Sequence, residues 1–367
     1  MIGYIVRRLL LVIPTMLGIM LLNFIIVQAA PGGPIQQVIS QMRGDASDID
    51  ARLGGSGDQM QREQTFGIDH SYRGAQGVDP AFIKQLEKQF GFDKPAHERF
   101  LLMLKNYARF DFGKSYFRDK SVIEVIKSKL PVSVSLGLWT TLLVYLISIP
   151  LGIRKAVHDG TRFDIITSAV VVVAYAVPSF LFALFLIVLF AGGSFFQFFP
   201  LRGLFSDHWA DLSFIGKITD YFWHLFLPLL AMVISGFAKL TLLTKNSFLE
   251  EINKQYVTTA RAKGLEEKKI LYGHIFRNAM LIVIAGFPAA FVHILFTSSL
   301  LIEVLFSLDG LGLLAFEAAL SRDYPVMFGC LYMFTLLGMF LHLIGDIMYM
   351  VVDRRIDLNA SRELQSQ

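Results

Sequence analysis

The sequence predicts an all-α membrane protein that crosses the bilayer six times. Hydrophobic residues make up 54% of the 367 residues and charged residues 17%, whereas soluble domains have roughly 45–50% and 25%. The hydrophobic residues are gathered in long blocks and are not spread with amphipathic spacing. Several blocks reach the roughly 20 residues that a helix needs to cross about 30 Å of hydrocarbon.

Six blocks are long enough to be transmembrane helices. The expected spans are residues 9–30, 132–153, 165–190, 222–243, 281–304 and 326–352. The first block follows Arg7 and Arg8 and ends in Val27-Gln28-Ala29, so a cleaved secretory signal is an alternative. Its apolar stretch is longer than the roughly 7–15 residues of a signal-peptide core, which favours an uncleaved helix.

Lysine and arginine predict the orientation of these spans, because basic short loops stay in the cytoplasm. The connections after the second and fourth spans and the C-terminal tail hold most of them. These residues are Arg154, Lys155, Arg162, Lys245, Lys254, Arg261, Lys263, Lys268, Lys269, Arg277, Arg354, Arg355 and Arg362. Both termini are therefore expected to be cytoplasmic, and the long stretch 31–130 to lie outside.

The outer stretch has two expected parts. Residues 36–77 are rich in Gly, Asp, Gln and Ser, which is typical of a loop. From residue 79 to about 129, apolar residues recur at helical spacing. They are Phe82, Leu86, Phe90, Phe100, Leu101, Leu104 and Tyr107. Ser121 followed by Glu124 has the pattern of a capping box, and the short helix that it opens is expected to end at Pro131.

Signatures of catalysis and of nucleotide binding are missing from the sequence. Gly113-Lys114-Ser115 is similar to the end of a phosphate-binding loop, but Ala108 stands where that motif needs a glycine. No Gly-x-Ser-x-Gly or His-Glu-x-x-His pattern occurs. The single cysteine, Cys330, excludes an intrachain disulfide and a zinc cluster, and is expected to be a buried apolar residue. Energy for uphill transport would have to come from a partner or an ion gradient.

Ionisable residues within spans are candidates for a translocation path, because each costs a few kcal/mol in lipid unless it is paired or hydrated. His293 lies midway along the fifth span, where a hydrogen-bonded packing histidine is the alternative, and Glu303 lies near its outer end. Lys239 and Asp346 lie near cytoplasmic ends, where they can reach water or a partner. No span carries the series of carboxylates expected of a proton-driven carrier.

The cytoplasmic connection 244–280 is the most informative segment. It predicts a short helix bearing Ala260 and Ala262, a break at Gly264 and a second helix from about Glu266. Gly264 suits the left-handed position that ends a helix. Apolar residues make this elbow too hydrophobic to face water on every side, so a groove in a partner is expected to receive it. They are Tyr256, Val257, Ile270 and Leu271. A plain basic loop is the alternative.

These residues carry a family resemblance. Thr259-Ala-Arg-Ala-Lys-Gly264, with His274 and Arg277-Asn278-Ala279 downstream, resembles the EAA loop of binding-protein-dependent ABC importers in its dipeptide and oligopeptide form. The loop begins Thr259-Ala260-Arg261 where the family often has Glu-Ala-Ala. Residues 4–34, 90–113 and 303–325 are similar to the family's first helix, external helical segment and re-entrant segment.

The resemblance implies a type I ABC importer permease fold in the bacterial inner membrane, with a periplasmic helical insert after the first helix. It implies three kinds of partner: a second homologous permease that forms a heterodimer, cytoplasmic ABC ATPase subunits or a tandem ATPase, and a periplasmic peptide-binding protein. Nucleic acid is not among them. The chain itself would bind no cofactor, because its partners hydrolyse ATP.

The implied organisation has four parts: the first helix at 1–30, a periplasmic loop and helical insert at 31–130, a five-helix core at 131–352 and a cytoplasmic tail at 353–367. The coupling loop at 244–280 would touch the ATPase. Its candidate residues are Tyr256, Ala260, Ala262, Gly264, Ile270, His274 and Arg277.

The implied activity is alternating-access import of oligopeptides. Residues 36–77, 150–155 and 199–204 are most similar to a subgroup that also carries the peptide-nucleotide antibiotic microcin C. A gradient-driven secondary peptide transporter and an intramembrane enzyme are the alternatives.

Overall fold

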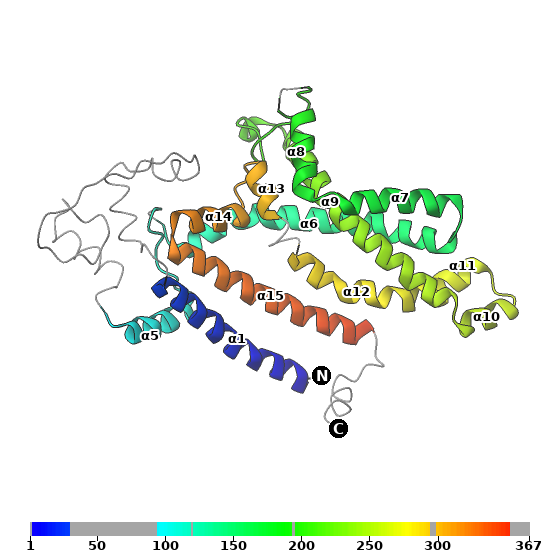
Figure 1. Ribbon diagram of the computed structural model, residues 1–367, viewed down its shortest axis with the longest axis horizontal. Coiled ribbons are helices and arrows are strands. Elements are labelled where there is room, and N and C mark those ends of the chain that lie inside the picture. Colours follow the sequence, from blue (N-terminus) through cyan, green and yellow to red (C-terminus); the bar gives the residue numbers. More distant parts are fainter. Residues whose placement is uncertain (1, 30–93, 119, 193–194, 294–298, 353–367) are drawn as a thin grey trace, which may run out of the picture. The chain divides into compact units, whose positions relative to one another are not determined.

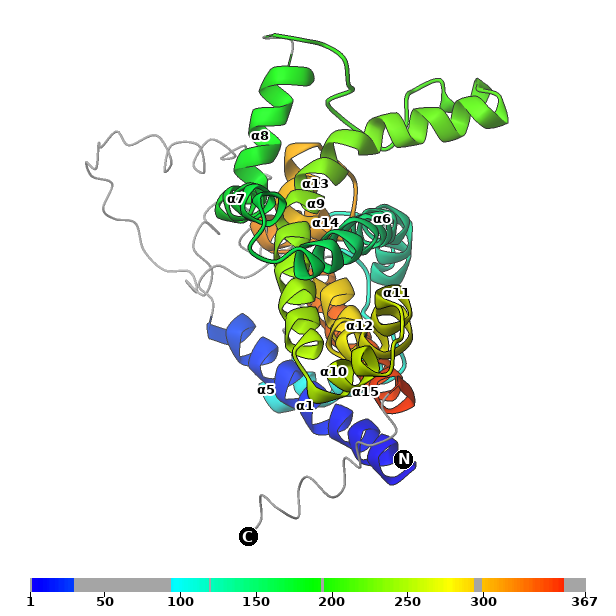
Figure 2. The same ribbon diagram turned by 90° about the vertical axis from the view of Figure 1, so that its right-hand side faces the viewer.

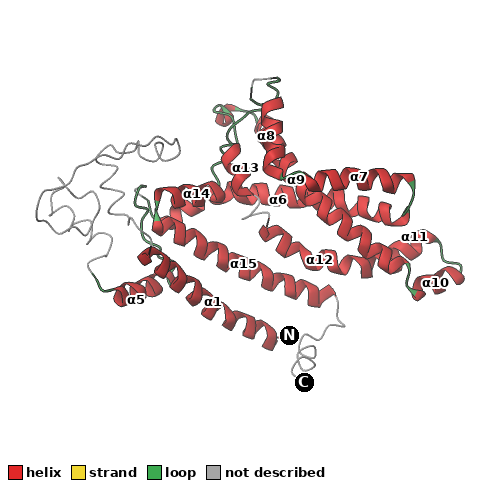
Figure 3. Cartoon of the chain, in the orientation of Figure 1, coloured by secondary structure: helices red, strands yellow, loops and turns green. Residues whose placement is uncertain are grey.

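The computed structural model describes residues 2–29, 94–118, 120–192, 195–293 and 299–352. Within these ranges all regular elements are helices, apart from one isolated bridge between Lys114 and Ser121, so the all-α expectation is confirmed (Figure 3). The α-helices are labelled in Figure 1. In chain order the elements are α1 (Ile2–Ala29), α5 (Ala96–Tyr107), α6 (Val122–Val157), α7 (Arg162–Ala176), α8 (Ser179–Phe190), η1 (Trp209–Asp211), α9 (Phe214–Ile252), α10 (Gln255–Ala262), α11 (Glu267–Ile270), η2 (Leu271–Ile275), α12 (Phe276–His293), α13 (Ser299–Leu305), α14 (Leu311–Ser321) and α15 (Tyr324–Val352).

The chain divides into two compact units. The larger unit comprises Met1–Val12, Ile126–Phe316 and Phe334–Gln367, and the smaller unit comprises Ile13–Val125 and Glu317–Met333.

Among the described residues, five helices are long and apolar enough to cross a membrane. They include the expected first, second, fourth and sixth spans, as α1, α6, α9 and α15. The bounds expected for the fifth span, 281–304, are wrong: the fifth candidate helix is Glu267–Pro288, and residues 299–304 belong to a separate helix, α13. The remaining expected span, 165–190, is a bent pair of helices, so six crossings result if that pair counts as one.

The structure corrects the straight third span. Helices α7 and α8 meet at 93°, a break that Figures 1 and 2 both display. The break lies at Val177, which takes an extended conformation, and at Pro178, which precedes α8. The proline explains the break, because its ring disfavours helical geometry in the residue before it.

A second correction concerns the helix that begins after Ser121. The expected capping box is confirmed: the Ser121 N–H donates to Glu124 Oε2 at 3.2 Å, and the Glu124 N–H donates to Ser121 Oγ at 3.4 Å. However, the prediction that this helix ends at Pro131 is wrong, because α6 continues for 36 residues with Pro131 and Pro150 inside it. Membrane helices tolerate such prolines because neighbouring groups satisfy the freed carbonyls.

The smaller unit holds the described part of the outer segment. The apolar spacing from Phe100 to Tyr107 forms α5 as expected, while the expected helical spacing at residues 79–93 and the loop 36–77 lie outside the described residues. The Ser115 hydroxyl of the Gly-Lys-Ser sequence donates to the buried Asp323 carboxylate, which also accepts from the Tyr116 N–H at 3.2 Å. Cys330 is buried, as expected.

Helix α9 organises the larger unit and packs against α7, α8 and α12. One hydrophobic cluster gathers residues of α6 and of the continuous stretch from α9 to α12, and includes Phe248, Val257 and Ile275. A second cluster gathers residues of α6, α8, α9 and α13, and includes Leu136 and Phe306. The elbow after α9 therefore stands on a packed core.

A buried ionic cluster links α6, α7 and α9 within the larger unit. Lys155 is completely buried, and its Nζ lies 2.9 Å from Asp164 Oδ1 and donates to the Thr167 and Ser168 hydroxyls. Lys245 of α9 lies 2.8 Å from Asp164 Oδ2 and 2.8 Å from Asp159 Oδ1. Lys155, which the sequence pattern places in a basic loop, is therefore an internal structural cation.

Candidate coupling site

The elbow that follows α9 comprises α10, α11, η2 and the start of α12, and it is built around a left-handed glycine. Gly264 has φ +77°, directly after α10 and its C-cap Lys263. The Gly264 N–H donates to the Arg261 carbonyl at 2.9 Å, and the Leu265 N–H donates to the Ala260 carbonyl at 3.3 Å. These two bonds form a Schellman motif, the helix ending that favours glycine at this position. The expected break at Gly264 is confirmed.

The second helix of the elbow begins where the sequence predicts, with Glu266 as the N-cap of α11. It continues without a break into η2, which is a five-residue π-helix, and then into α12. The π-helix is not signalled by the sequence. Such segments are rare and occur often at functional sites. Figure 1 shows α10 and α11 together at the end of the α9–α12 pair.

The inner face of the elbow is filled by this chain's own core. Val257 and Ile270 are fully buried and Ala260 is buried, all in the cluster that includes Phe248 of α9 and Ala279 of α12. The expectation that Val257 and Ile270 need a partner's groove is therefore wrong, because α9 and α12 supply that groove.

The outer face of the elbow is exposed. Four of the expected coupling residues lie there: Ala262, Gly264, His274 and Arg277. Tyr256 is half-buried. Two further apolar residues are exposed, Leu265 at 39% and Tyr272 at 61%. The sequence analysis missed both of these residues. Tyr272 follows the fully buried Ile270 by two positions, and that spacing places it on a different face of a helix.

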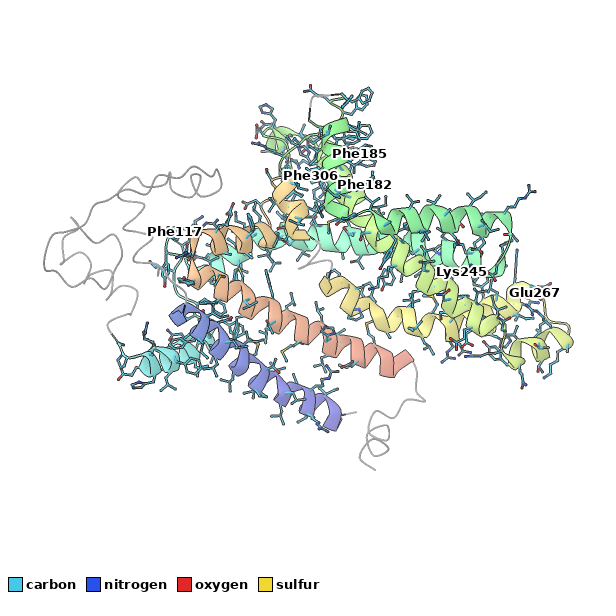
Figure 4. The ribbon with its side chains drawn as sticks, in the orientation of Figure 1. Phe117, Phe182, Phe185, Lys245, Glu267 and Phe306 are labelled. Atoms are coloured by element: carbon cyan, nitrogen blue, oxygen red, sulfur yellow. The ribbon has the colours of Figure 1, made fainter. Side chains whose placement is uncertain are left out.

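Polar contacts stiffen the elbow. Arg261 of α10 and Glu267 of α11 form a two-point ion pair, with Nε to Oε1 at 2.7 Å and Nη2 to Oε2 at 3.2 Å. This pair closes the loop around Gly264, and Figure 4 shows Glu267 near α10 and α11. Two-point pairs between arginine and a carboxylate fix orientation as well as distance.

A second polar contact ties the start of α10 to the end of α9. The Tyr256 hydroxyl donates to Glu251 Oε2 at 2.7 Å, and the Asn278 side-chain amide donates to the Tyr256 oxygen at 3.4 Å. The hydrogen bond from Lys254 to Glu251 raises the pKa of Lys254 above its usual value. Burial raises the pKa of Tyr256. Tyr256 therefore stays protonated and acts as a hydrogen-bond donor at neutral pH.

A cavity of about 420 Å³ lies beside the elbow, lined by residues of α9, α12 and α15. Glu251 and Asn278 are part of its wall, and Asp346 of α15 forms another part. Asp346 lies 2.7 Å from Arg8, so the expectation that it can pair at its helix end is confirmed.

The two candidate residues of the translocation path are not part of the elbow. Glu303 of α13 is fully buried, and its carboxylate accepts from the Ser133 hydroxyl at 2.7 Å and from the Leu313 N–H at 2.9 Å. His293 is the last residue of α12, and its side chain lies outside the described part of the structure.

Comparison with known families gives one match over more than half of the chain. Residues 148–358 match the profile of the binding-protein-dependent transport system inner membrane component family. The matched region contains the elbow, the ionic cluster around Lys155, the buried Glu303 and the last span.

Three curated proteins are similar over 97% of this chain. A peptidoglycan transport system permease protein, YejB, of Agrobacterium fabrum is 60% identical over 98% of its own length. An inner membrane ABC transporter permease protein, also YejB, of Escherichia coli O157:H7 is 58% identical over 98% of its length. An oligopeptide transport system permease protein, AppB, of Bacillus subtilis is 32% identical over its full length.

Solved structures with a similar fold include an ABC importer. A chain of the MetNI methionine ABC transporter, in an inward-facing conformation, superposes on 63% of this chain and 97% of its own length. The TM-score is 0.50 and the sequence identity 14%. At that identity the similarity extends to the fold alone.

Proposed function

The chain belongs to the binding-protein-dependent transport system inner membrane component family and is a permease subunit of an ABC importer; from this premise we propose that its cargo is oligopeptides. The observation that carries the proposal is the full-length similarity to permeases named for oligopeptide and peptidoglycan transport. Short peptides released from peptidoglycan are the first cargo to test, and microcin C-like peptides the second.

Membership of the family implies ATPase partners and a substrate-binding protein in general. We propose further that the second permease is a distinct homologous chain, so that the two permeases form a heterodimer. The partner ATPases, as separate subunits or one tandem chain, would hydrolyse ATP on the cytoplasmic side. This chain would bind no cofactor.

The protein is a multi-pass protein of the inner membrane. The basic connections and tail support cytoplasmic N- and C-termini. With that orientation residues 31–130 are periplasmic and the elbow faces the ATPases. The segment boundaries at 30, 130 and 352 remain part of the proposal, although α6 runs without a break through the second of them.

The proposed coupling surface is the outer face of the elbow. Ala262, Gly264, His274 and Arg277 would contact the ATPase directly, together with the exposed Tyr272. Ala260 and Ile270 would act indirectly, by packing α10 and α11 against the hydrophobic core. Tyr256 would hold the start of α10 to α9 through its hydrogen bond to Glu251. Closure of the ATPases would move this rigid elbow, and the helices would exchange outward-open and inward-open states.

Uptake by a deletion strain tests the cargo. A strain that lacks this chain and redundant peptide importers should take up labelled peptidoglycan-derived peptides and other oligopeptides several-fold more slowly. Restoring the wild-type chain should restore uptake, and the matched control is the Gly264→Val chain, expressed equally well, which should not restore it. Uptake that is unchanged by the deletion would remove the peptide proposal and leave the family membership intact.

Microcin C tests the second cargo in the same strains. Deletion should make the cells resistant to the antibiotic, and the wild-type chain should restore sensitivity. Resistance without any change in peptide uptake would mean that the antibiotic is carried but that ordinary oligopeptides are not.

A further inference from the structure

The turn between α13 and α14 encloses a fully buried carboxylate. Glu303 lies on α13 with no exposed surface. Its Oε1 accepts from the Ser133 hydroxyl of α6 at 2.7 Å, and its Oε2 accepts from the Leu313 N–H of α14 at 2.9 Å. In both contacts a carboxyl oxygen is the acceptor. In this conformation the carboxylate is enclosed by the protein on every side.

Ser133 extends this contact to a second backbone donor. Its Oγ accepts from the Leu311 N–H at 2.8 Å while its hydroxyl donates to Glu303. The first residues of a helix carry N–H groups without partners inside the helix. In α14 two of these groups, on Leu311 and Leu313, are satisfied by a side chain of α6 and a side chain of α13.

The backbone of the turn has glycine where it approaches the carboxylate. A Cβ atom added to Gly310 would lie 2.5 Å from the Glu303 carboxyl carbon, and one added to Gly312 would lie 2.9 Å from Glu303 Oε2. Non-bonded carbon contacts are favourable only near 3.5–4.0 Å. Any larger residue at position 310 or 312 would therefore collide with the Glu303 side chain unless one of them moved.

The same face of α6 holds the turn at three levels. Lys129, four residues before Ser133, forms an ion pair with Asp309 in the turn. Leu136, three residues after Ser133, lies in one hydrophobic cluster with Phe306 and Leu308. Figure 4 shows Phe306 beside α13. The turn is attached to α6 by ionic, hydrogen-bonded and apolar contacts at successive helical turns.

We propose that Glu303 is a positioning residue of the transport cycle, whose buried carboxylate keeps the turn between α13 and α14 seated on α6 so that the two move together. Through this node, a signal from the binding protein on the outer side reaches the helices that carry the elbow. The inference rests on the transport cycle and orientation of the proposed function, but not on which cargo is carried.

The functional test compares two ATPase rates in the complete importer complex. Glu303→Gln keeps the size of the side chain. Its amide N–H2 group, however, would face one of the two donors that the carboxylate now accepts from, the Ser133 hydroxyl or the Leu313 N–H. Stimulation of ATP hydrolysis by the purified binding protein should fall about tenfold or more, while the unstimulated rate and the amount of complex stay near wild type. Glu317→Gln, which alters a half-exposed carboxylate on α14, is the matched control and should change neither rate.

A geometric readout needs no cargo and no ATP. Lys129→Cys with Asp309→Cys, in a Cys330→Ala background, gives two thiols that a short bismaleimide can bridge. Bridging should be efficient in the otherwise unchanged chain, and should fall several-fold when Glu303→Gln or Ser133→Ala is added. Since both substitutions act on one node, the combination of Glu303→Gln with Ser133→Ala should lose no more bridging than the stronger single change.

The outcomes decide the proposal without reference to peptides. Wild-type bridging and wild-type stimulation in Glu303→Gln would overturn it. If Glu303→Gln does not accumulate, Ser133→Ala decides by the same two readouts. An importer that proves to carry no peptide, yet loses bridging and stimulation in these variants, would refute the cargo and retain the positioning role.

Discussion

At the scale of single residues, two alanines of the elbow that look alike in the sequence differ in burial. Ala260 is buried against α9 and α12, whereas Ala262, two positions later on the same helix, is exposed. Gly264 then ends the helix in the left-handed conformation. The sequence predicts the glycine correctly because its chemistry is local. The two alanines could not be told apart, because packing against distant helices decides which face of a short helix is buried.

Gly264→Val should insert into the membrane normally and lose transport. A Cβ atom at this position would have no neighbour within 4 Å, so the substitution acts on the backbone alone, at about 1–2 kcal/mol for a left-handed β-branched residue. That cost is too small to unfold the protein, but it favours an altered elbow. Co-purification of the ATPase and stimulated ATP hydrolysis measure the effect. Gly264→Asn, which tolerates this conformation, is the control and should stay near wild type; equal transport by both variants would contradict the prediction.

The two alanines give a matched pair. Ala260→Glu places a charge in the packed core, with an expected loss of a few kcal/mol, so the elbow should become sensitive to protease and the protein less abundant. Ala262→Glu should leave abundance and protease resistance unchanged while weakening ATPase co-purification. Both quantities can be measured on membranes from the same cultures. Identical behaviour of the two variants would mean that the elbow does not have the two faces described.

At the scale of elements, hydropathy found the apolar segments but not their shape. It predicted one span at 165–190 and gave no sign of the 93° bend between α7 and α8 around Val177 and Pro178. It also predicted a helix end at Pro131, through which α6 continues. Hydropathy measures composition alone. Proline breaks the helix at residue 178, whereas α6 continues through Pro131 and Pro150. The local signals that proved reliable were those with a specific hydrogen bond, such as the Ser121–Glu124 capping box.

The ionic cluster that joins α6, α7 and α9 predicts unequal effects for two aspartates. Asp164→Asn removes the carboxylate that faces the fully buried Lys155, so roughly 3–5 kcal/mol of stability should be lost. Asp159→Asn removes a half-exposed partner of Lys245 and should cost less than about 1 kcal/mol. Thermal unfolding in detergent compares the two proteins. A smaller loss for Asp164→Asn than for Asp159→Asn would show that burial does not govern this cluster.

At the scale of the whole molecule, the sequence predicted the class of fold and the family. The six apolar blocks predicted a membrane protein, and the residues around Gly264 predicted the importer family. The full-length similarities confirm the family. The buried node around Glu303 was not predicted. Its members lie about 180 residues apart in the chain, and no periodicity within one segment signals a contact of that range.

Reporter fusions test the orientation of the molecule. Fusions after Leu53 and Asp211 should be active only with a periplasmic reporter, and a fusion after Lys254 only with a cytoplasmic reporter, because basic connections stay inside. Activity of each fusion, normalised to its amount, is the measurement. A cytoplasmic signal from the fusion at residue 53 would reverse the order of the spans.

Helix α6 is fastened by buried polar contacts near both ends. Ser133 engages Glu303, and Lys155, about 22 residues further along, engages Asp164. At 1.5 Å per residue these attachments are about 33 Å apart, which is close to the thickness of the hydrocarbon layer. We expect a displacement of α6 at one attachment to be transmitted to the other for as long as both buried contacts hold. A conformation open to both sides, through which protons would leak and dissipate the membrane potential, would then require one of these contacts to break.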